Sequence, residues 1–190
     1  MKEISERNNR ADSDTILSPG NEGFRIIRNG IYVDKTGIIN VINKTINTSD
    51  RLTCISRPRR FGKSYTAQTL CAYYGRGYDS HDLFENLEIS KNSDYEKYIN
   101  SFNVIYLDIT GFISSAIMID NVVSDMRKTI IDELLIKFPC AGIEQTDKLG
   151  VALLKAKSDS QIKFFFIIDE WDALFREQKK NNANQKKSRV

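Results

Sequence analysis

A basic loop at the start of a helix is the strongest candidate for chemistry in this sequence. The segment Arg57–Ser64 reads Arg-Pro-Arg-Arg-Phe-Gly-Lys-Ser, and it lies between the apolar run Leu52–Ile55 and residues with helical spacing. This order predicts a strand, a tight loop and a helix, whose first N–H groups and dipole can hold the phosphates of a nucleoside triphosphate. We expect Lys63 to bridge the β- and γ-phosphates and Ser64 to bind Mg²⁺. Gly62 would let the backbone approach the phosphates.

The loop departs from the usual sequence G-x-x-x-x-G-K-[ST] in two ways. Arg57 stands at the first glycine position, and Pro58 removes one N–H donor. The arginines could compensate by placing positive charge beside the phosphates, or they could face solvent or pair with carboxylates. The alternative for the whole segment is a Gly-Lys-Ser that opens a helix by chance. We assign nucleotide binding to the complete loop, which comprises Arg57, Pro58, Arg59, Arg60, Phe61, Gly62, Lys63, Ser64 and Tyr65.

A second candidate group follows an apolar strand. Phe164–Ile168 leads directly into Asp169 and Glu170. Ligands in α/β proteins bind at the carboxyl ends of the strands, so we expect Asp169 to hold Mg²⁺ through water and Glu170 to orient or deprotonate an attacking water. The candidate catalytic residues are therefore Glu170 and Lys63. The alternative is that the two acids only cap the next helix, Trp171–Glu177.

Other polar and aromatic residues near the strand ends have structural interpretations. Asp108 ends another apolar strand, and we expect it to cap a turn rather than to join the acid pair. Trp171 and Phe175 are four residues apart and would share a helix face, where packing in the core is favoured over stacking on a base.

Histidine and cysteine give little support to other kinds of site. His81 is the only histidine, so a histidine-based triad or metal cluster is not predicted. The three cysteines are widely spaced and fit neither a disulfide framework nor a zinc site. We expect Cys54 and Cys71 to be buried, reduced thiols.

Composition and charge limit the classes of protein to which the chain can belong. Its 190 residues are 41% hydrophobic and 28% charged, as in an ordinary globular protein. The net charge is +3, but residues 176–190 carry six basic side chains and one acidic one, so the rest of the chain has a net charge of about −2. Nucleic-acid binding through the arginine loop and the basic tail is therefore only a weak alternative. The polar N-terminus and the short apolar runs predict a cytoplasmic protein that does not enter membranes.

The apolar pattern predicts strands that alternate with helices. A hairpin is expected first, because Phe24–Arg28 and Ile31–Asp34 flank the turn dipeptide Asn29-Gly30. A capping box at Ser93–Glu96 should begin a short helix. The remaining elements are helices at 35–46, 63–74, 115–137 and 147–157 and strands at 52–56, 104–108 and 163–169. The helix at 115–137 should bury Ile119, Val122, Val123, Met126, Ile130 and Leu134.

These elements predict an α/β fold. Parallel strands connected by helices form a three-layer P-loop NTPase core with a parallel sheet, here preceded by the small N-terminal hairpin. We expect residues 1–20 to be a flexible N-terminus, 21–177 a partial P-loop ATPase domain, and 178–190 a disordered basic tail.

The combined motifs resemble the AAA-ATPase-like family of bacterial proteins over about residues 22–177. The resemblance rests on Tyr32–Thr36, Ser56–Ser64, Leu83-Phe84 with Leu87–Ile89, Val104–Asp108 and Ile167–Glu170. It implies that Gly62, Lys63 and Ser64 bind ATP. It also implies that Asp169 and Glu170 serve Mg²⁺ binding and water activation. Asp34-Lys35-Thr36 resembles a family motif that we expect to pack against the nucleotide loop.

The family resemblance also implies parts for which the sequence has no counterpart. Members pair the ATPase domain with a C-terminal PD-(D/E)XK nuclease-like domain, and P-loop ATPases with such an acid pair place a later strand between the loop strand and the acid strand. We therefore expect a C-terminally truncated form without the late strands. Two functions remain open: a module that binds and hydrolyses ATP to drive a nuclease-like partner, or a non-hydrolysing remnant that binds nucleotide or a protein partner.

Overall fold

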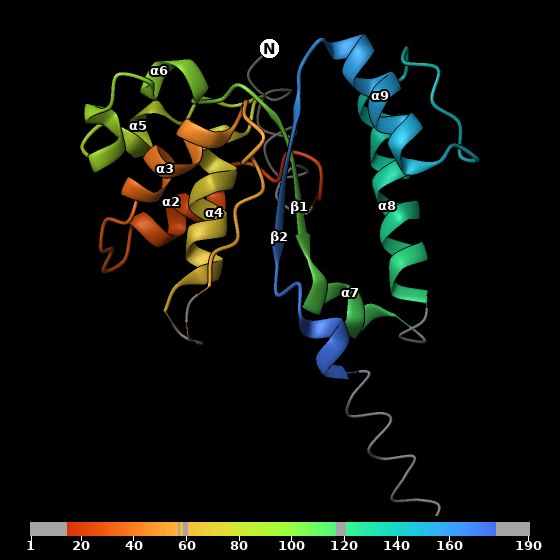
Figure 1. The fold of residues 1–190 in the computed structure, drawn as a ribbon, viewed down its shortest axis with the longest axis horizontal. Coiled ribbons are helices and arrows are strands. Elements are labelled where there is room, and N and C mark those ends of the chain that lie inside the picture. Colours follow the sequence, from red (N-terminus) through yellow and green to blue (C-terminus); the bar gives the residue numbers. More distant parts are fainter. Residues whose placement is uncertain (1–14, 57, 59–60, 117–120, 178–190) are drawn as a thin grey trace, which may run out of the picture. The chain divides into compact units, whose positions relative to one another are not determined.

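The structure of the chain is a computed structural model that describes residues 15–56, 58, 61–116 and 121–177 (Figure 1). It divides into two compact units: Met1–Ile105 with Ile162–Ile167, and Tyr106–Gln161 with Ile168–Val190. The described strands, β1 (Asn103–Asp108) and β2 (Phe164–Asp169), form a two-stranded parallel sheet. Helices combined with this sheet place the chain in the α/β class.

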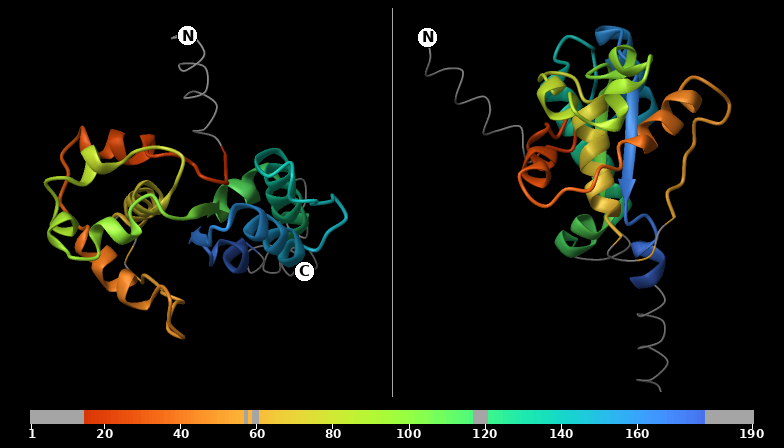
Figure 2. Two further views of the ribbon diagram at one scale, coloured as in Figure 1. Left: turned by 90° about the horizontal axis from the view of Figure 1, so that it is seen from above. Right: turned by 90° about the vertical axis from the view of Figure 1, so that its left-hand side faces the viewer.

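Helix α4 (Lys63–Tyr74) is the centre of the first unit. The other elements of this unit are α2 (Glu22–Arg28), α3 (Gly37–Thr45), α5 (His81–Phe84), the 3₁₀ helix η2 (Glu88–Lys91) and α6 (Tyr95–Tyr98). Helix α2 packs against both α4 and α5, while η2 contacts α3 and α6 (Figures 1 and 2). Gly23 of α2 faces the side chain of Gln68 on α4.

Aromatic rings fill the core around α4. Phe24 stacks on Phe84 with ring centroids 4.9 Å apart, and Tyr73 meets Phe84 edge-on at 5.4 Å. Tyr74 donates a hydrogen bond of 2.7 Å to Asn43 Oδ1. Tyr73 donates one of 2.9 Å to the carbonyl of Tyr95. Burial raises the pKa of Tyr73 to about 12, so its hydroxyl group remains a hydrogen-bond donor at neutral pH.

The second unit is built on a pair of packed helices. Helix α8 (Val122–Lys137) contacts α9 (Leu149–Ser160) and α7 (Ile109–Ser115). Asp108 caps α7, because its Oδ1 accepts a hydrogen bond of 2.9 Å from the Thr110 N–H. The expected capping role of Asp108 is confirmed.

The predicted N-terminal hairpin is wrong. Its first arm is helix α2, and the residues of its second arm form no strand. The turn signal Asn29-Gly30 instead follows the end of the helix, where the Asn29 N–H bonds to the Arg25 carbonyl. In this helix the ring of Phe24 is fully buried against Phe84 and Tyr32, and this burial stabilises α2 over the predicted hairpin.

The predicted strand at 52–56 is also wrong. The segment has no strand pairing, and the side chain of Leu52 is 90% exposed. A strand is stable only when its backbone groups pair, and no described strand pairs with this one. Cys54 is consequently exposed, contrary to expectation, whereas Cys71 is buried as predicted.

The predicted helix at 115–137 corresponds to α8, which ends at Lys137 as expected but begins later than expected, and residues 117–120 lie outside the described residues. Helix α7 ends at Ser115 and α8 begins at Val122. Val122, Ile130 and Leu134 are buried as expected, but Val123 is exposed. Ile119 lies outside the described residues. No helix of the described ranges is long and apolar enough to cross a bilayer.

Candidate functional site

The first turn of α4 follows a glycine that makes no side-chain capping bond. Gly62 is the N-cap residue, with a left-handed conformation of φ 78° and ψ 30°. Its carbonyl accepts hydrogen bonds from the Thr66 N–H at 2.9 Å and from Thr66 Oγ1 at 3.1 Å. Gly62 has no side chain with which to cap the N–H groups of the first turn, and no acidic residue lies in that turn. These N–H groups and the helix dipole therefore favour a bound anion.

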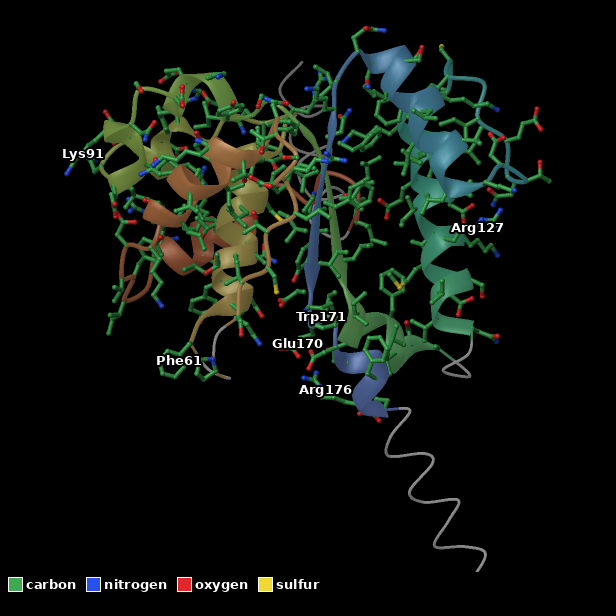
Figure 3. The ribbon with its side chains drawn as sticks, viewed as in Figure 1. Phe61, Lys91, Arg127, Glu170, Trp171 and Arg176 are labelled. Atoms are coloured by element: carbon green, nitrogen blue, oxygen red, sulfur yellow. The ribbon has the colours of Figure 1, made fainter. Side chains whose placement is uncertain are left out.

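The side chains that flank Gly62 are accessible. Lys63 is half-buried and Ser64 is exposed. Phe61 and Tyr65 are 59% and 62% exposed, and Figure 3 shows Phe61 in the loop that precedes α4. The loop thus combines an ammonium group, a hydroxyl group and aromatic surface within one turn of chain. Pro58 is exposed, and the predicted ligands Arg57, Arg59 and Arg60 lie outside the described residues.

A second lysine contacts this loop from a distant part of the sequence. Lys35 Nζ donates a hydrogen bond of 3.4 Å to the Phe61 carbonyl. A Cβ atom placed on Gly62 would lie 3.4 Å from the same nitrogen. The expectation that the segment Asp34–Thr36 packs against the loop agrees with these contacts. Sequence reasoning did not include Lys35 among the site residues, although the similarity of its segment to a family motif was a signal.

The acid pair occupies the end of β2 and the residue after it. Asp169 is 9% exposed, and its Oδ1 accepts a hydrogen bond of 3.0 Å from the Glu170 N–H. Glu170 has a φ of 51°, a left-handed conformation that is uncommon for a residue with a side chain. Such backbone strain is frequent at functional positions.

An arginine holds the carboxylate of Glu170. Arg176 Nη2 lies 2.6 Å from Glu170 Oε2, and Arg176 Nη1 lies 3.0 Å from Asp172 Oδ2. Figure 3 shows Glu170 and Arg176 together beyond the end of β2. The hydrogen bond to Glu170 raises the pKa of Arg176. The sequence predicts no role for Arg176 beyond its contribution to the positive charge of residues 176–190, and only its spacing from Glu170 could have indicated the pair.

The side chains after the acid pair do not form a core. Trp171 and Phe175 are 58% and 59% exposed, with ring centroids 6.3 Å apart in an edge-to-face arrangement. The expectation that they pack in the core is wrong: Trp171 lies in a turn and Phe175 in the helical residues 173–177, and both rings are at the surface of this unit.

Two of the predicted site residues carry oxygen ligands of the kind that binds Mg²⁺. Among the described residues, no group of three or more His, Cys, Asp or Glu side chains could hold a metal ion. Mg²⁺ commonly uses one or two carboxylates together with phosphate oxygens and water. The nearly buried carboxylate of Asp169 and the exposed hydroxyl of Ser64 are chemically suited to this pattern.

The loop and the acid pair belong to different units. Lys63 and Ser64 lie in the first unit, and Asp169 and Glu170 lie in the second. Their convergence on one nucleotide stays a prediction.

Comparison with known proteins gives one match. The model of the AAA-ATPase-like family, described as predicted AAA-ATPase, matches residues 20–190. No curated protein and no solved structure matches the chain. A match over most of the chain supports a nucleotide-binding, ATPase-like role at a coarse level.

Proposed function

Because the chain belongs to the AAA-ATPase-like family, we propose that it binds ATP with Mg²⁺ at the N-terminus of α4 and hydrolyses the γ-phosphate bond. The observation that carries this proposal is the start of α4. There a left-handed Gly62 precedes Lys63 and Ser64 at the head of a helix of 12 residues. A helix of this length, whose N-cap residue makes no side-chain hydrogen bond to the first turn, favours the binding of a polyphosphate at its N-terminus.

The side chains have distinct roles in the proposed reaction. Lys63 neutralises charge on the β- and γ-phosphates, and Phe61 and Tyr65 lie beside the bound nucleotide. Glu170 orients the attacking water and accepts its proton. The water oxygen forms the new bond to the γ-phosphorus while the bond to the β–γ bridging oxygen breaks, which releases ADP and phosphate. Mg²⁺, held by Ser64 and Asp169, would neutralise phosphate charge when bound.

The proposed ATPase domain comprises residues 21–177. By analogy with the family resemblance, its conformational changes would act on a nuclease-like domain or a protein partner.

Two substitutions test the proposal. Lys63→Ala should reduce ATP affinity beyond detection in isothermal titration calorimetry, because it removes the cation that faces the phosphates. Glu170→Gln should keep wild-type affinity but stop phosphate release. Lys91→Ala, an exposed lysine of η2 in the same unit as Lys63, is the control and should bind as the wild type does. Wild-type affinity in Lys63→Ala would contradict the assignment of the site.

A second candidate function is nucleotide binding without turnover. The ion pair between Arg176 and Glu170 favours it, because this contact occupies a carboxylate oxygen that an attacking water would use. The two functions differ in one measurement: a binding module releases phosphate no faster than Glu170→Gln, although it binds ATP normally.

A further inference from the structure

The segment before α3, which carries the exposed Lys35, is anchored by hydrogen bonds on both sides of this lysine. Asp34 Oδ1 accepts hydrogen bonds from the Thr36 N–H at 2.8 Å and from Thr36 Oγ1 at 2.7 Å. Its Oδ2 accepts a hydrogen bond of 2.7 Å from the Glu88 N–H. Thr36 is fully buried, and its Oγ1 accepts a hydrogen bond of 3.2 Å from the Ile89 N–H. Residues on both sides of Lys35 are thereby tied to η2.

The charge of Asp34 is part of this anchor. Partial burial opposes ionisation, but hydrogen bonds from the backbone of Thr36 and Glu88 outweigh it and lower the pKa of the carboxyl group. Asp34 therefore remains an ionised acceptor throughout the neutral pH range.

The ammonium group of Lys35 lies on the backbone of the loop that starts α4. In the part of the chain that the structure describes, its one hydrogen bond is the contact of 3.4 Å with the Phe61 carbonyl. A lysine has three N–H donors, so this contact leaves capacity for other acceptors. The position is also unfavourable for a cation when no anion is bound, because the N-terminus of a helix carries partial positive charge. A polyphosphate bound at the N-terminus of α4 would instead attract the ammonium group of Lys35.

We propose that Lys35 is a second cationic ligand of the nucleotide polyphosphate, with Asp34 and Thr36 as its positioning residues. The inference rests on the proposed function, since it concerns the same loop. Lys35 donates to a non-bridging oxygen of the phosphates that lie on the first turn of α4, and Lys63 contacts them from the helix itself. The alternative role for Lys35 is structural, in which its ammonium group only secures the Phe61 carbonyl.

The experiment compares ATP affinity and thermal stability in four variants of the full chain. Lys35→Ala should weaken ATP binding by about ten- to a hundredfold, the effect of losing one hydrogen bond to a charged group. Lys35→Arg should retain most of the affinity, because it keeps a cationic donor. Asp34→Asn should weaken binding less than Lys35→Ala does, since it loosens the segment without removing the ammonium group. Lys91→Ala, an exposed lysine on η2, is the matched control and should bind as the wild type does.

Two further readouts separate a phosphate ligand from a structural contact. Tripolyphosphate should compete with ATP for the site. Its affinity should be lower in Lys35→Ala than in the wild type, by the same factor as the affinity of ATP. Without nucleotide, the melting temperature of Lys35→Ala should not fall below that of the wild type. The substitution removes an ammonium group that the partial positive charge at the N-terminus of α4 repels. A lower melting temperature without nucleotide, together with unchanged ATP affinity, would establish the structural role and overturn the inference.

The test also distinguishes this inference from the function on which it rests. If the wild type does not bind ATP, both are overturned. If the wild type binds ATP, Lys63→Ala does not, and Lys35→Ala binds with wild-type affinity, the proposed function stands and the role of Lys35 is refuted.

Discussion

Tyr74 stacks on Phe165, with ring centroids 4.2 Å apart and ring planes inclined by 22°. Tyr74 is the last residue of α4, the helix that begins at Lys63, and Phe165 belongs to β2, the strand that ends at Asp169. Phe102 completes the cluster, with its ring centroid 5.7 Å from each of the other two. Helix α4 and strand β2 therefore contact each other through Tyr74 and Phe165. Tyr74 lies at the opposite end of α4 from Lys63, and Phe165 lies near the opposite end of β2 from Asp169.

Removing the ring of Phe165 should destabilise the first unit. We expect Phe165→Ala to lower the free energy of unfolding by about 2–4 kcal/mol, because the rings of Tyr74 and Phe102 lose their contact surface. Urea denaturation measures the change. Phe166→Ala is the matched control: this neighbouring ring is exposed on the other face of β2 and should contribute less than about 1 kcal/mol. Equal losses for the two variants would contradict the importance of the stack.

A side chain at Gly62 should damage both the fold and the site. The left-handed backbone at this residue costs roughly 1 kcal/mol or more for alanine, and the new methyl group would crowd the surface that faces the phosphates. Gly62→Ala should therefore lower the melting temperature and weaken ATP binding.

Gly142→Ala separates the two effects of the Gly62 substitution. Gly142 has a φ of 65° and no atoms within 4 Å of a Cβ added there, so its replacement introduces similar strain away from the loop. Its melting temperature should fall by a comparable amount with ATP affinity unchanged. A loss of affinity in this control would mean that strain alone explains the effect of Gly62→Ala.

Release of Glu170 from Arg176 should change turnover more than affinity. The pair is partly exposed and therefore weak, so Arg176→Ala should raise the rate of phosphate release by about two- to fivefold if the ion pair competes with the attacking water. Asp172→Ala removes the other carboxylate on Arg176 but keeps the pair with Glu170, and it should leave the rate unchanged. A slower rate in Arg176→Ala would show instead that the arginine orients Glu170 for the reaction.

The His81 cluster predicts a pH dependence of stability. His81 Nδ1 lies 2.5 Å from Asp79 Oδ1 and Nε2 lies 3.2 Å from Glu96 Oε2. The hydrogen bond to Asp79, supported by Glu96, raises the pKa of His81 above 6.5. Because the folded pKa is the higher one, the stabilisation is fully present below the unfolded pKa of about 6.5 and is lost as pH rises through the folded pKa. The melting temperature of His81→Asn should therefore be lower than that of the wild type at pH 6 and equal to it at pH 9. A difference in melting temperature that grows as the pH rises would contradict this prediction.

Elements with strong local signals were predictable from sequence. The spacing of apolar residues and the glycine after Tyr74 gave the bounds of α4, and the runs at 104–108 and 163–169 gave β1 and β2 within one residue. The helices α3 and α9 were likewise expected close to their observed positions. In these segments the local pattern and the tertiary contacts favour the same structure.

Other elements depended on distant contacts that no local pattern contains. The Asn29-Gly30 signal for a hairpin was overridden by the burial of Phe24 on Phe84. The Ser93–Glu96 capping box does not form either: α6 has Asp94 at its N-cap, with no side-chain capping bond, and Glu96 pairs with His81 instead. The site shows the same division. The local sequence Gly62–Ser64 predicted the start of α4. The contact between Lys35 and Phe61 joins residues 26 positions apart, so no local pattern could indicate it. The ion pair of Arg176 with Glu170 depends on the turn after β2.

The left-handed backbone of Glu170 makes this position one at which folding and chemistry favour different amino acids. Glycine would relieve about 1–2 kcal/mol of steric conflict at such a φ, so a chain selected for thermal stability alone would carry glycine there. A carboxylate at residue 170 therefore opposes the conformational preference of its own backbone, and selection of variants of this chain for heat resistance should favour Glu170→Gly.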